Sequence, residues 1–283
     1  MKVAIIGYGF VGKALHNGIK DDIEVFLVDP KLGTSVNDIK DFQPNIIFIC
    51  VPTPMNDDGS QDIEILINTA NKISKLKIAS LIVLKSTVLP NFIEDLEKII
   101  PSVLYNPEFL KESSANEDFI SAELILIGGN KEKALLLSEF YKNSTKCIAQ
   151  DHQFTDLISA SLIKYSINNF LAAKVIFFNQ LNDVFKNSGT FEEWENFTKI
   201  LSVDSRIGKS HMEVPGPDGK RGFGGSCFPK DSNAFLFYSK DIKKPFTILE
   251  RIISINNTLR SKYKSLNQRE IEQNINFDEI KNK

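Results

Sequence analysis

The chain has 283 residues, of which 42% are hydrophobic and 25% charged, so it is an ordinary globular sequence long enough for two domains. Its formal net charge of −2 gives no reason to expect nucleic acid or an anionic membrane surface as a partner. No apolar run approaches the roughly 20 residues that a membrane-spanning helix needs, so no membrane partner is expected.

The cysteines and histidines are few and scattered. Cys50, Cys147 and Cys227 lie far apart, which is typical of neither a disulfide framework nor a zinc site. The three histidines show no metal-ligand spacing either, so no metal is expected. A reducing, cytoplasmic setting fits this cysteine usage best.

A strand, a glycine fingerprint, a helix and a second strand open the chain in that order. Residues 2–6 and 24–28 are the two apolar strands, and Gly7-Tyr8-Gly9-Phe10-Val11-Gly12 stands between the first strand and the helix. This order predicts a dinucleotide site, in which Gly7 permits the tight turn, Gly9 the approach of the pyrophosphate and Gly12 the packing of helix on strand. Asp29, at the end of the second strand, would bind the ribose hydroxyls and repel a 2′-phosphate, so NAD is preferred over NADP.

Strand-like and helical patterns then alternate up to about residue 150. The further strands are expected at 46–50, 81–84, 103–105 and 124–127, and helices at 63–76, 90–99 and 131–142. This alternation predicts an α/β fold, a Rossmann-like doubly wound parallel sheet with helices on both faces, over residues 1–150. Three segments that follow strands should rim the cofactor cleft: Val51-Pro52-Thr53-Pro54, Lys85-Ser86-Thr87-Val88 and Asn106-Pro107-Glu108-Phe109-Leu110-Lys111-Glu112.

The second half reads as an all-α domain over residues 151–265. Asp151 to Ser188 contains no Gly or Pro and has apolar residues at helical spacing, which predicts a helix of some 35 residues, about 50 Å long, that links domains or forms an oligomer interface. Lys164 and Asn168 lie one turn apart on a face that otherwise reads as buried. Periodicity alone slightly favours a Lys164 that reaches out to solvent.

The remaining segments are shorter. Residues 189–201 and 246–262 have helical patterns, residues 213–222 have the composition of a mobile loop, and residues 266–283 form a polar tail expected to be loosely ordered.

The stretch from Gly222 to Asp231 combines three glycines, one cysteine and Pro229. Proline is tolerated in the first turn of a helix, so Cys227 should lie at or just before a helix N-terminus, where a thiolate is favoured. Asp231 would face the same side one turn later. A buried structural cysteine after a glycine turn is an equally supported alternative from this segment alone.

Taken together, these motifs resemble the nucleotide-sugar 6-dehydrogenases, the UDP-glucose/GDP-mannose dehydrogenase family. The matching segments follow in family order up to about Arg260: Gly7–Gly12 with Asp29, Val51–Pro54, Lys85–Val88, Asn106–Glu112, Lys164–Leu171, Asp204–Gly208 and Gly222–Asp231. The resemblance implies oxidation of a nucleotide-sugar alcohol to an acid by two NAD molecules, as in the conversion of UDP-glucose to UDP-glucuronate for polysaccharide biosynthesis.

The resemblance also implies roles for particular residues. Cys227 resembles the nucleophile that carries a thiohemiacetal and then a thioester, Glu108 the group that activates water, and Lys164 with Asn168 the pair that stabilises oxyanion charge. Asp231 and Thr87 resemble the groups that order the lysine and the water. Cofactor contacts are implied for Gly7, Tyr8, Gly9, Phe10, Val11, Gly12, Asp29, Val51, Pro52, Thr53, Ser86, Thr87 and Glu112. Substrate contacts are implied for Glu108, Phe109, Leu110, Lys164, Asn168, Arg206, Phe223, Gly224 and Gly225.

The chain departs from the family pattern in two ways. Family members carry a third domain that holds much of the nucleotide, and this chain is expected to lack it. The loop before Cys227 is enlarged, and we expect Lys220 and Arg221 to bind the diphosphate there.

Two alternative functions remain. A single-step hydroxyacid or sugar dehydrogenase would need no thiol, and a non-catalytic dinucleotide-binding scaffold would need none of the reactive side chains. A homodimer through the long helix is expected from the apolar excess of that helix.

Overall fold

The computed structural model describes residues 1–277 of the chain. It divides into two compact units, and the division falls inside one helix. The first unit comprises Met1–Thr53 and Asp62–Lys164, and the second comprises Pro54–Gln61 and the chain from Tyr165 onward.

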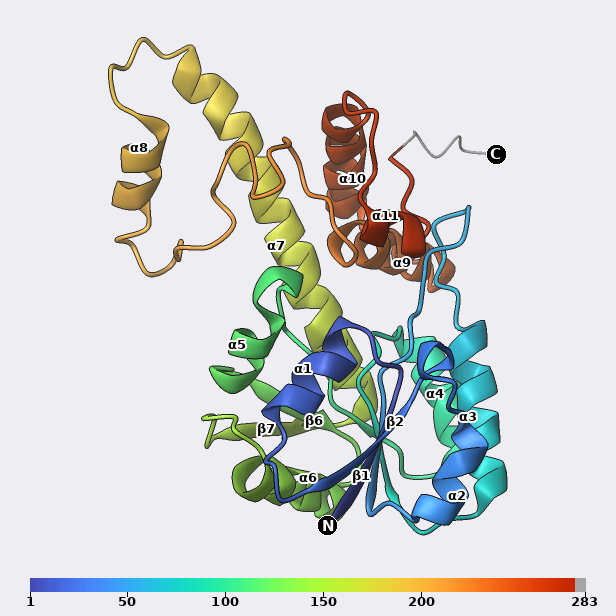
Figure 1. Ribbon diagram of the computed structural model, residues 1–283. Coiled ribbons are helices and arrows are strands. Elements are labelled where there is room, and N and C mark those ends of the chain that lie inside the picture. The colour runs from blue at the N-terminus through green and yellow to red at the C-terminus, as the bar shows by residue number, and fades with distance from the viewer. Residues whose placement is uncertain (278–283) are drawn as a thin grey trace. The chain divides into compact units, whose positions relative to one another are not determined.

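One sheet of seven strands forms the centre of the first unit (Figure 1). Its strands run in the order β2-β1-β3-β4-β5-β6-β7. They are β1 (Lys2–Ile6), β2 (Glu24–Val28), β3 (Ile46–Ile49), β4 (Leu81–Leu84), β5 (Leu104–Tyr105), β6 (Ile125–Gly128) and β7 (His152–Thr155). The prediction of a Rossmann-like α/β fold is confirmed.

The sheet differs from the expected all-parallel arrangement at one edge. Strands β1 to β5 are parallel, but β6 meets β5 in the antiparallel sense at Tyr105 and Gly128, and β7 runs parallel to β6. An apolar run predicts that a strand exists but carries no information on its direction, which is decided by pairing between segments distant in the chain.

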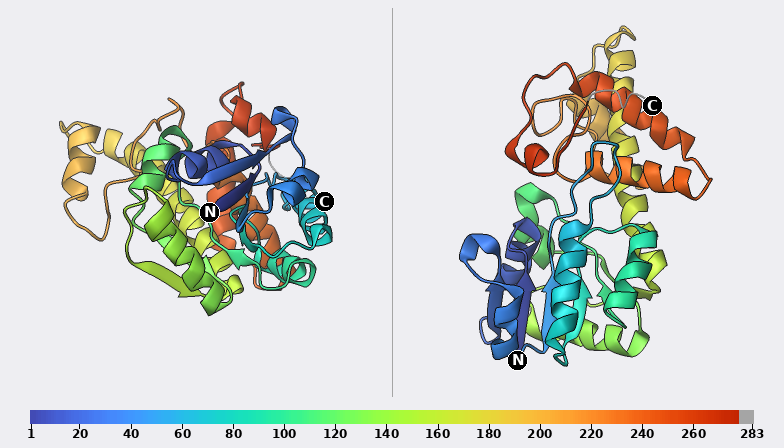
Figure 2. Two further views of the ribbon diagram at one scale, coloured as in Figure 1. Left: turned by 60° about the horizontal axis from the view of Figure 1, so that its bottom comes forward. Right: turned by 90° about the vertical axis from the view of Figure 1, so that its right-hand side faces the viewer.

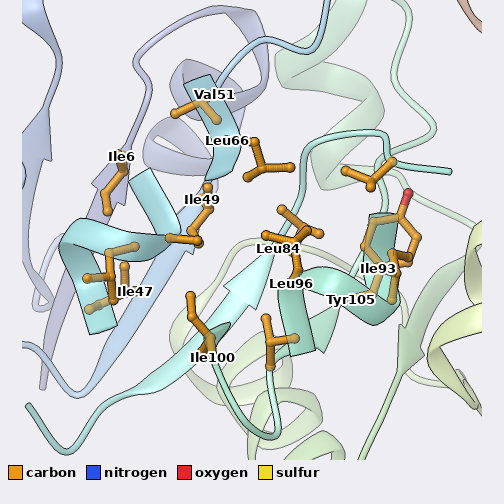
Figure 3. Close-up of a cluster of buried hydrophobic side chains, with 14 of the residues drawn as sticks. Ile6, Ile47, Ile49, Val51, Leu66, Leu84, Ile93, Leu96, Ile100 and Tyr105 are labelled. Atoms are coloured by element: carbon orange, nitrogen blue, oxygen red, sulfur yellow. The ribbon is translucent and has the colours of Figure 1, made fainter. Parts of the chain in front are cut away.

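Helices cover both faces of the sheet. Alternate side chains of β1 point to opposite faces, so that Val3 and Ile5 pack with α1 (Phe10–Gly18), α5 (Ala115–Ile120) and α6 (Lys131–Ser144). Ala4 and Ile6 pack with α2 (Ile39–Phe42), α3 (Glu64–Leu76) and α4 (Pro90–Ile99) in the core drawn in Figure 3. Each fully buried Ile or Leu contributes about 1.5–3 kcal/mol, which makes these two layers the main stabilisation of the first unit.

Short 3₁₀ helices add to the connections. They are η1 (Pro30–Leu32) and η2 (Val36–Asp38), both after β2, and η3 (Glu112–Ser114) before α5.

The long helix α7 extends from Leu157 to Lys186, 30 residues or about 45 Å. The expectation of a helix from Asp151 was wrong at its start, because residues His152–Thr155 form β7 instead. Asp156 separates the two elements: its carboxylate accepts hydrogen bonds from the Ser159 N–H (2.8 Å) and hydroxyl (2.6 Å) and so caps the helix. These hydrogen bonds also lower the pKa of Asp156.

The second unit is helical (Figure 2). It contains α8 (Trp194–Leu201), α9 (Phe228–Asp241), α10 (Thr247–Arg260) and α11 (Gln268–Glu272). Side chains of α10 and of the segment at Phe223 pack on Ala172 and Ile176 of α7. A separate aromatic cluster around Trp194 holds α8, which begins five residues later than its pattern predicted.

The C-terminal segment is more ordered than its polar composition suggested. The short helix α11 begins with a reciprocal Asn267–Glu270 capping box, and Glu270 is completely buried. The expected loose tail therefore does not begin at residue 266, and residues 278–283 lie outside the described part of the chain. None of the helices within residues 1–277 has the length and apolar character to cross a bilayer.

Candidate active site

The glycine fingerprint forms a tight turn between β1 and α1. Gly7 has a positive φ of 93°, and an added Cβ there would lie 2.6 Å from the carbonyl oxygen of Cys50. An added Cβ on Gly12 would collide with the carbonyl oxygen of Gly7, so α1 approaches the turn as closely as only glycine permits. The first and third glycines are therefore required by the backbone itself.

The second glycine faces open space. A Cβ on Gly9 would meet no atom within 4 Å, and the first turn of α1 has no side-chain cap at Gly9. Asp29 lies at the end of the neighbouring strand β2, where its carboxylate accepts the Tyr8 N–H (2.8 Å) and the Lys31 N–H (2.9 Å). An uncapped helix N-terminus, room at Gly9 and a carboxylate at the end of β2 fit the phosphates and ribose of a dinucleotide.

The turn lies where ligands usually bind in an open α/β sheet. Strands β1 and β3 are neighbours, and the helices that follow them, α1 and α3, cover opposite faces. The loops after β3 and β4 are joined by two hydrogen bonds: Ser86 donates to the Val51 carbonyl (2.7 Å), and Thr53 donates to the Thr87 carbonyl (2.9 Å). Pro52 is exposed beside this joined pair of loops.

Lys85 and Asn106 begin two of the segments that were expected to rim the cofactor cleft, but both side chains are buried in a polar cluster at the ends of β4 and β5. The Lys85 ammonium donates to Asn106 Oδ1 (2.9 Å) and to the Tyr141 hydroxyl (3.2 Å), and Asn106 also receives the Tyr141 hydroxyl (2.6 Å). Burial lowers the pKa of Lys85 to about 8 and raises the pKa of the nearby Cys50 thiol to about 12. A lysine directly after a fully apolar strand was the available signal for this cluster.

Lys164 and Glu108 form a buried pair in the first unit. Lys164 is 2% exposed, and its ammonium donates to the carbonyl (2.6 Å) and carboxylate (3.2 Å) of Glu108. The other carboxylate oxygen of Glu108 accepts the Leu110 N–H (2.6 Å), and the Lys164 ammonium lies 5.2 Å from the centre of the Phe109 ring. The expectation from periodicity that Lys164 reaches solvent is therefore wrong, whereas Glu112 is exposed at the start of η3.

Cys227 is the N-cap residue of α9, and its carbonyl accepts the Asp231 N–H (2.9 Å). Asp231 is 1% exposed and binds two polar side chains, the Asn168 amide (2.7 Å) and the Lys230 ammonium (2.5 Å). Ser232 is also buried, and its hydroxyl has no hydrogen-bond partner among residues 1–277. The first turns of α9 therefore bury several polar side chains, one of which is unpaired. This is unusual for a packed helix, because buried polar groups are normally paired.

Four other residues, Arg206, Phe223, Gly224 and Gly225, are expected to contact the substrate, and they differ in how deeply they are buried. Arg206 is exposed and paired with Asp204 (2.6 Å). Phe223 packs into the core of the second unit, and a Cβ on Gly224 would collide with Arg260 and Glu270. Gly225 has a φ of 78°, and a Cβ added there would meet no atom of the described residues within 4 Å. Of these four residues, Arg206 is exposed, Gly224 and Gly225 are half-buried, and Phe223 is buried.

The two basic residues of the enlarged loop have partners within the chain. Lys220 donates to the Ser265 carbonyl (2.6 Å), and the Arg221 guanidinium donates to the Asn179 carbonyl (2.7 Å) and to Asp183 (2.8 Å). The structure thus uses both residues to attach the loop to the second unit. The idea that they grip a diphosphate finds no support here. No group of three or more His, Cys, Asp or Glu side chains in the described residues is arranged to hold a metal ion.

Two family models match the chain, one in each half. Residues 31–145 match the NAD binding domain of the UDP-glucose/GDP-mannose dehydrogenase family, and residues 158–258 match its central domain. The chain belongs to this family. The first match begins after the glycine fingerprint, so the geometry at Gly7, Gly9 and Gly12 is independent support for an NAD-binding domain.

Curated relatives and a solved structure agree with this assignment. UDP-glucose 6-dehydrogenase YwqF of Bacillus subtilis is 36% identical over 76% of this chain and 49% of its own length. A UDP-glucose 6-dehydrogenase of Rickettsia felis is 38% identical over 65% of this chain and 41% of its own length. The chain thus spans about half the length of these relatives. A UDP-glucose dehydrogenase structure from Pyrobaculum islandicum is 26% identical, with a TM-score of 0.75 over 91% of this chain and 68% of its own.

Proposed function

We propose that this protein is an NAD-dependent dehydrogenase that oxidises the C6 alcohol of a nucleotide sugar to a carboxylate, with UDP-glucose as substrate and UDP-glucuronate as product. Its family membership, its NAD-binding domain and the names of its relatives support this proposal. Within it, residues 1–150 serve as the NAD-binding domain, residues 151–265 as the helical central domain, and residues 266–283 as the C-terminal segment.

One observation carries the proposal beyond the family name. Asp231 is a buried carboxylate on the first turn of α9, the helix that Cys227 caps. It accepts hydrogen bonds from the Asn168 amide and the Lys230 ammonium. Burying a carboxylate, an ammonium and an amide in one place is unfavourable unless the arrangement is fully paired or has a task. Cys227 is the N-cap residue of that helix, and the positive end of a helix favours the thiolate form of a cysteine, as in an activated nucleophile.

The proposed chemistry consists of two hydride removals separated by a bond to sulfur. When bound, NAD accepts the hydride. The alcohol loses a hydride and a proton to become an aldehyde, and the Cys227 sulfur then adds to the aldehyde carbon to form a thiohemiacetal. Loss of a second hydride, to a second NAD, and of a proton leaves a thioester. Hydrolysis by water breaks the carbon–sulfur bond, restores the thiol and releases the acid.

Five further residues have roles in this proposal. Lys164 and Asn168 stabilise the negative charge that develops on the C6 oxygen. Glu108 takes the proton from the attacking water, as a carboxylate hydrogen-bonded to Lys164 is able to do. Thr87 orders that water, and Arg206 contacts the substrate from its exposed loop.

Counting NADH per sugar tests the proposal. A panel of nucleotide sugars with NAD, followed at the NADH absorbance band, should give two NADH per molecule of UDP-glucose. One NADH per substrate would favour a single-step dehydrogenase instead, and none with any sugar would favour a scaffold.

The thiol step has its own test. Cys227→Ser should release the first NADH and accumulate aldehyde, because an alcohol adds to and leaves a carbonyl carbon far less readily than a thiolate. Full two-NADH turnover by this variant would contradict the thioester route. Cys147→Ser is the matched control, since Cys147 is buried in the core of the first unit.

We also propose a homodimer formed through α7, in a reducing cytoplasmic setting. Phe170, Phe177 and Val184 are 71%, 61% and 65% exposed, and they recur every seven residues along one stripe of the helix. Large apolar side chains repeated at this spacing are typical of a helix that packs on another helix. Sedimentation equilibrium at micromolar concentration should show a dimer, and a monomer would contradict this assembly.

A further inference from the structure

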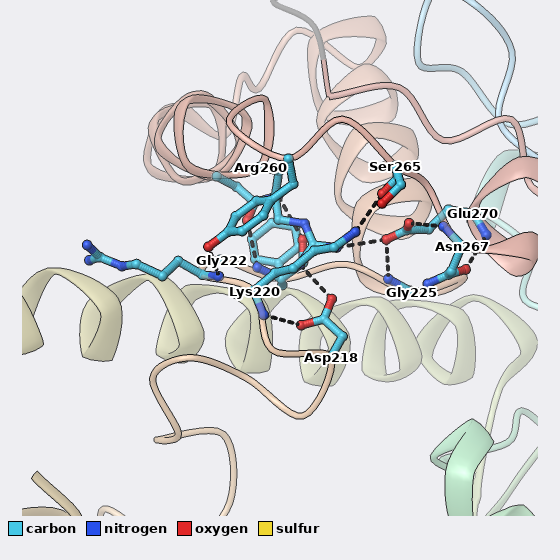
Figure 4. A network of polar contacts seen from close by, with 12 residues as sticks. Asp218, Lys220, Gly222, Gly225, Arg260, Ser265, Asn267 and Glu270 are labelled. Atoms are coloured by element: carbon cyan, nitrogen blue, oxygen red, sulfur yellow. Dashed lines mark hydrogen bonds and ion pairs between the residues drawn. The ribbon is translucent and has the colours of Figure 1, made fainter.

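The loop that leads to Cys227 is attached to the C-terminal segment by a buried ionic network within the second unit (Figure 4). The Arg260 guanidinium, at the end of α10, donates through Nη1 to Asp218 (2.7 Å) and through Nη2 to Glu270 (2.9 Å). Asp218 lies in the middle of the loop (residues 213–222), and Glu270 contacts Gly225 just after its end. A single arginine therefore links the enlarged loop to α11.

Glu270 contacts the glycine segment directly. Its Oε1 accepts the Gly225 N–H (3.0 Å) as well as the Arg260 guanidinium, and its Oε2 accepts the Asn267 N–H (2.8 Å). Gly225 is two residues before Cys227. An N–H held by a fully buried carboxylate cannot move without breaking a charge-assisted hydrogen bond.

The neighbouring glycines are held against the same network. Asn256, one turn before Arg260 on α10, accepts the Phe223 N–H (2.7 Å) and donates to the Phe223 carbonyl (3.0 Å). Gly224 has no room for a Cβ because Arg260 and Glu270 fill that space, and Gly222 has a positive φ of 77°. The backbone from Gly222 to Gly225 is therefore in contact with all three side chains, Asn256, Arg260 and Glu270.

The charges of Arg260 and Glu270 are buried, which is energetically costly. Arg260 and Glu270 are 2% and 0% exposed, and the Phe277 ring lies 5.2 Å from the guanidinium carbon. A buried ion pair contributes little net stability compared with apolar residues of the same size, so a gain in stability alone does not explain it. Orientation of a reactive loop does explain it.

We infer that Arg260 and Glu270 are positioning residues for Cys227, which hold the glycine segment so that the thiol stays at the N-terminus of α9. This inference deepens the proposed function, since it takes Cys227 as the reacting group. Neither residue contacts the reacting atoms in this account. Both act through the backbone of Gly225.

The main test neutralises the pair while keeping the volume of its side chains. In the Arg260→Met, Glu270→Gln double variant no buried charge is left without its partner, because Asp218, which also loses Arg260, has a side chain that is 37% exposed to solvent. Glutamine, however, offers one oxygen where the Gly225 and Asn267 N–H groups both need an acceptor. Its kcat should fall about ten- to a hundredfold while the KM for NAD stays the same, because a small misplacement of the reacting group affects the chemical step.

The thiol itself supplies a second readout that needs no substrate. Alkylation by iodoacetamide, resolved by peptide mapping, should slow at Cys227 by about two- to fivefold, as the thiol leaves the helix N-terminus, and should not change at Cys50 or Cys147. The matched control is Arg269→Met, Glu272→Gln, which removes an exposed ion pair on the same helix α11 (2.9 Å) and should leave kcat and alkylation unchanged.

The possible outcomes separate the two proposals. A folded Arg260→Met, Glu270→Gln variant with parental kcat and parental Cys227 alkylation would overturn the inference. If the double variant does not fold by circular dichroism, Arg260→Lys replaces it, since one ammonium cannot bridge both carboxylates. Failure of both variants to fold would assign the pair to stability alone. If the parent oxidises no sugar, the proposed function fails, and the alkylation rates still decide the role of Arg260 and Glu270.

Discussion

Replacing Lys164 with methionine should both destabilise the first unit and stop catalysis. The change removes the ammonium that Glu108 faces at 3.2 Å and the hydrogen bond to the Glu108 carbonyl at 2.6 Å. The Glu108 carboxylate then stays buried, and within residues 1–277 the Leu110 N–H is its remaining hydrogen-bond donor. Breaking a buried pair on one side costs about 3–5 kcal/mol. At about 2–4 °C per kcal/mol for a unit of this size, the melting temperature should fall by roughly 6–20 °C.

The double variant Lys164→Met, Glu108→Gln separates stability from catalysis. A neutral amide beside a methionine leaves no uncompensated charge, so most of the lost stability should return. The oxidation should not return, because both the oxyanion-stabilising ammonium and the base are missing. Thermal unfolding followed by circular dichroism and NADH formation from UDP-glucose measure the two effects. A single variant as stable as the parent, or a double variant that turns over at the parental rate, would refute the reasoning.

Three other predictions test the dinucleotide turn, the buried lysine and the dimer. Gly9→Ala should keep the melting temperature but weaken NAD binding measured by calorimetry, since its Cβ enters open space where the phosphates would lie, whereas Gly12→Ala should lower the melting temperature because its Cβ meets backbone. Burial lowers the pKa of Lys85 to about 8, so at this site the unfolded chain binds more protons than the folded chain above pH 8, which contributes stability that rises with pH. Burial raises the pKa of Cys50 from 9.0 to about 12, so this thiol contributes stability that falls over the same pH range. In urea titrations of the parent and of Lys85→Met, which share the Cys50 contribution, the stability of the parent relative to the variant should therefore rise by up to about 1 kcal/mol between pH 8 and 9. Phe177→Glu should convert the dimer to a monomer in sedimentation, since a charge replaces an exposed apolar side chain of α7; an unchanged dimer would place the interface elsewhere.

Local sequence patterns were sufficient to predict most of the helices and strands and the dinucleotide turn. Strands β1 and β2 and helices α3 and α4 begin and end within one residue of their predicted bounds, because short apolar runs, amphipathic spacing and Pro90 are signals read from neighbouring residues. The error at the start of the long helix arose because a local signal was overlooked. The Asp156 cap, which ends β7 and starts α7, lies inside a run without Gly or Pro that suggested one long helix.

Amino-acid composition predicted mobility for the loop before Cys227 and for the segment after α10, whereas the structure attaches both to the second unit. Both are rich in polar residues and glycine or asparagine, which usually indicates mobility. Asp218 and Glu270 are instead held by Arg260, and no pattern in either segment announces this contact. The most polar parts of the chain turned out to enclose some of its most deeply buried charges.

By itself, the sequence determined what depends on near neighbours: the order of strands and helices, the glycine turn at Gly7 and the position of Cys227 at the start of a helix. Only the tertiary structure decided that Lys164 is buried against Glu108, that Asp231 binds Asn168 and that Glu270 holds Gly225. The physical reason is separation along the chain, since these partners are 56, 63 and 45 residues apart. The protonation, burial and orientation of a polar side chain are set by the groups that folding brings to it.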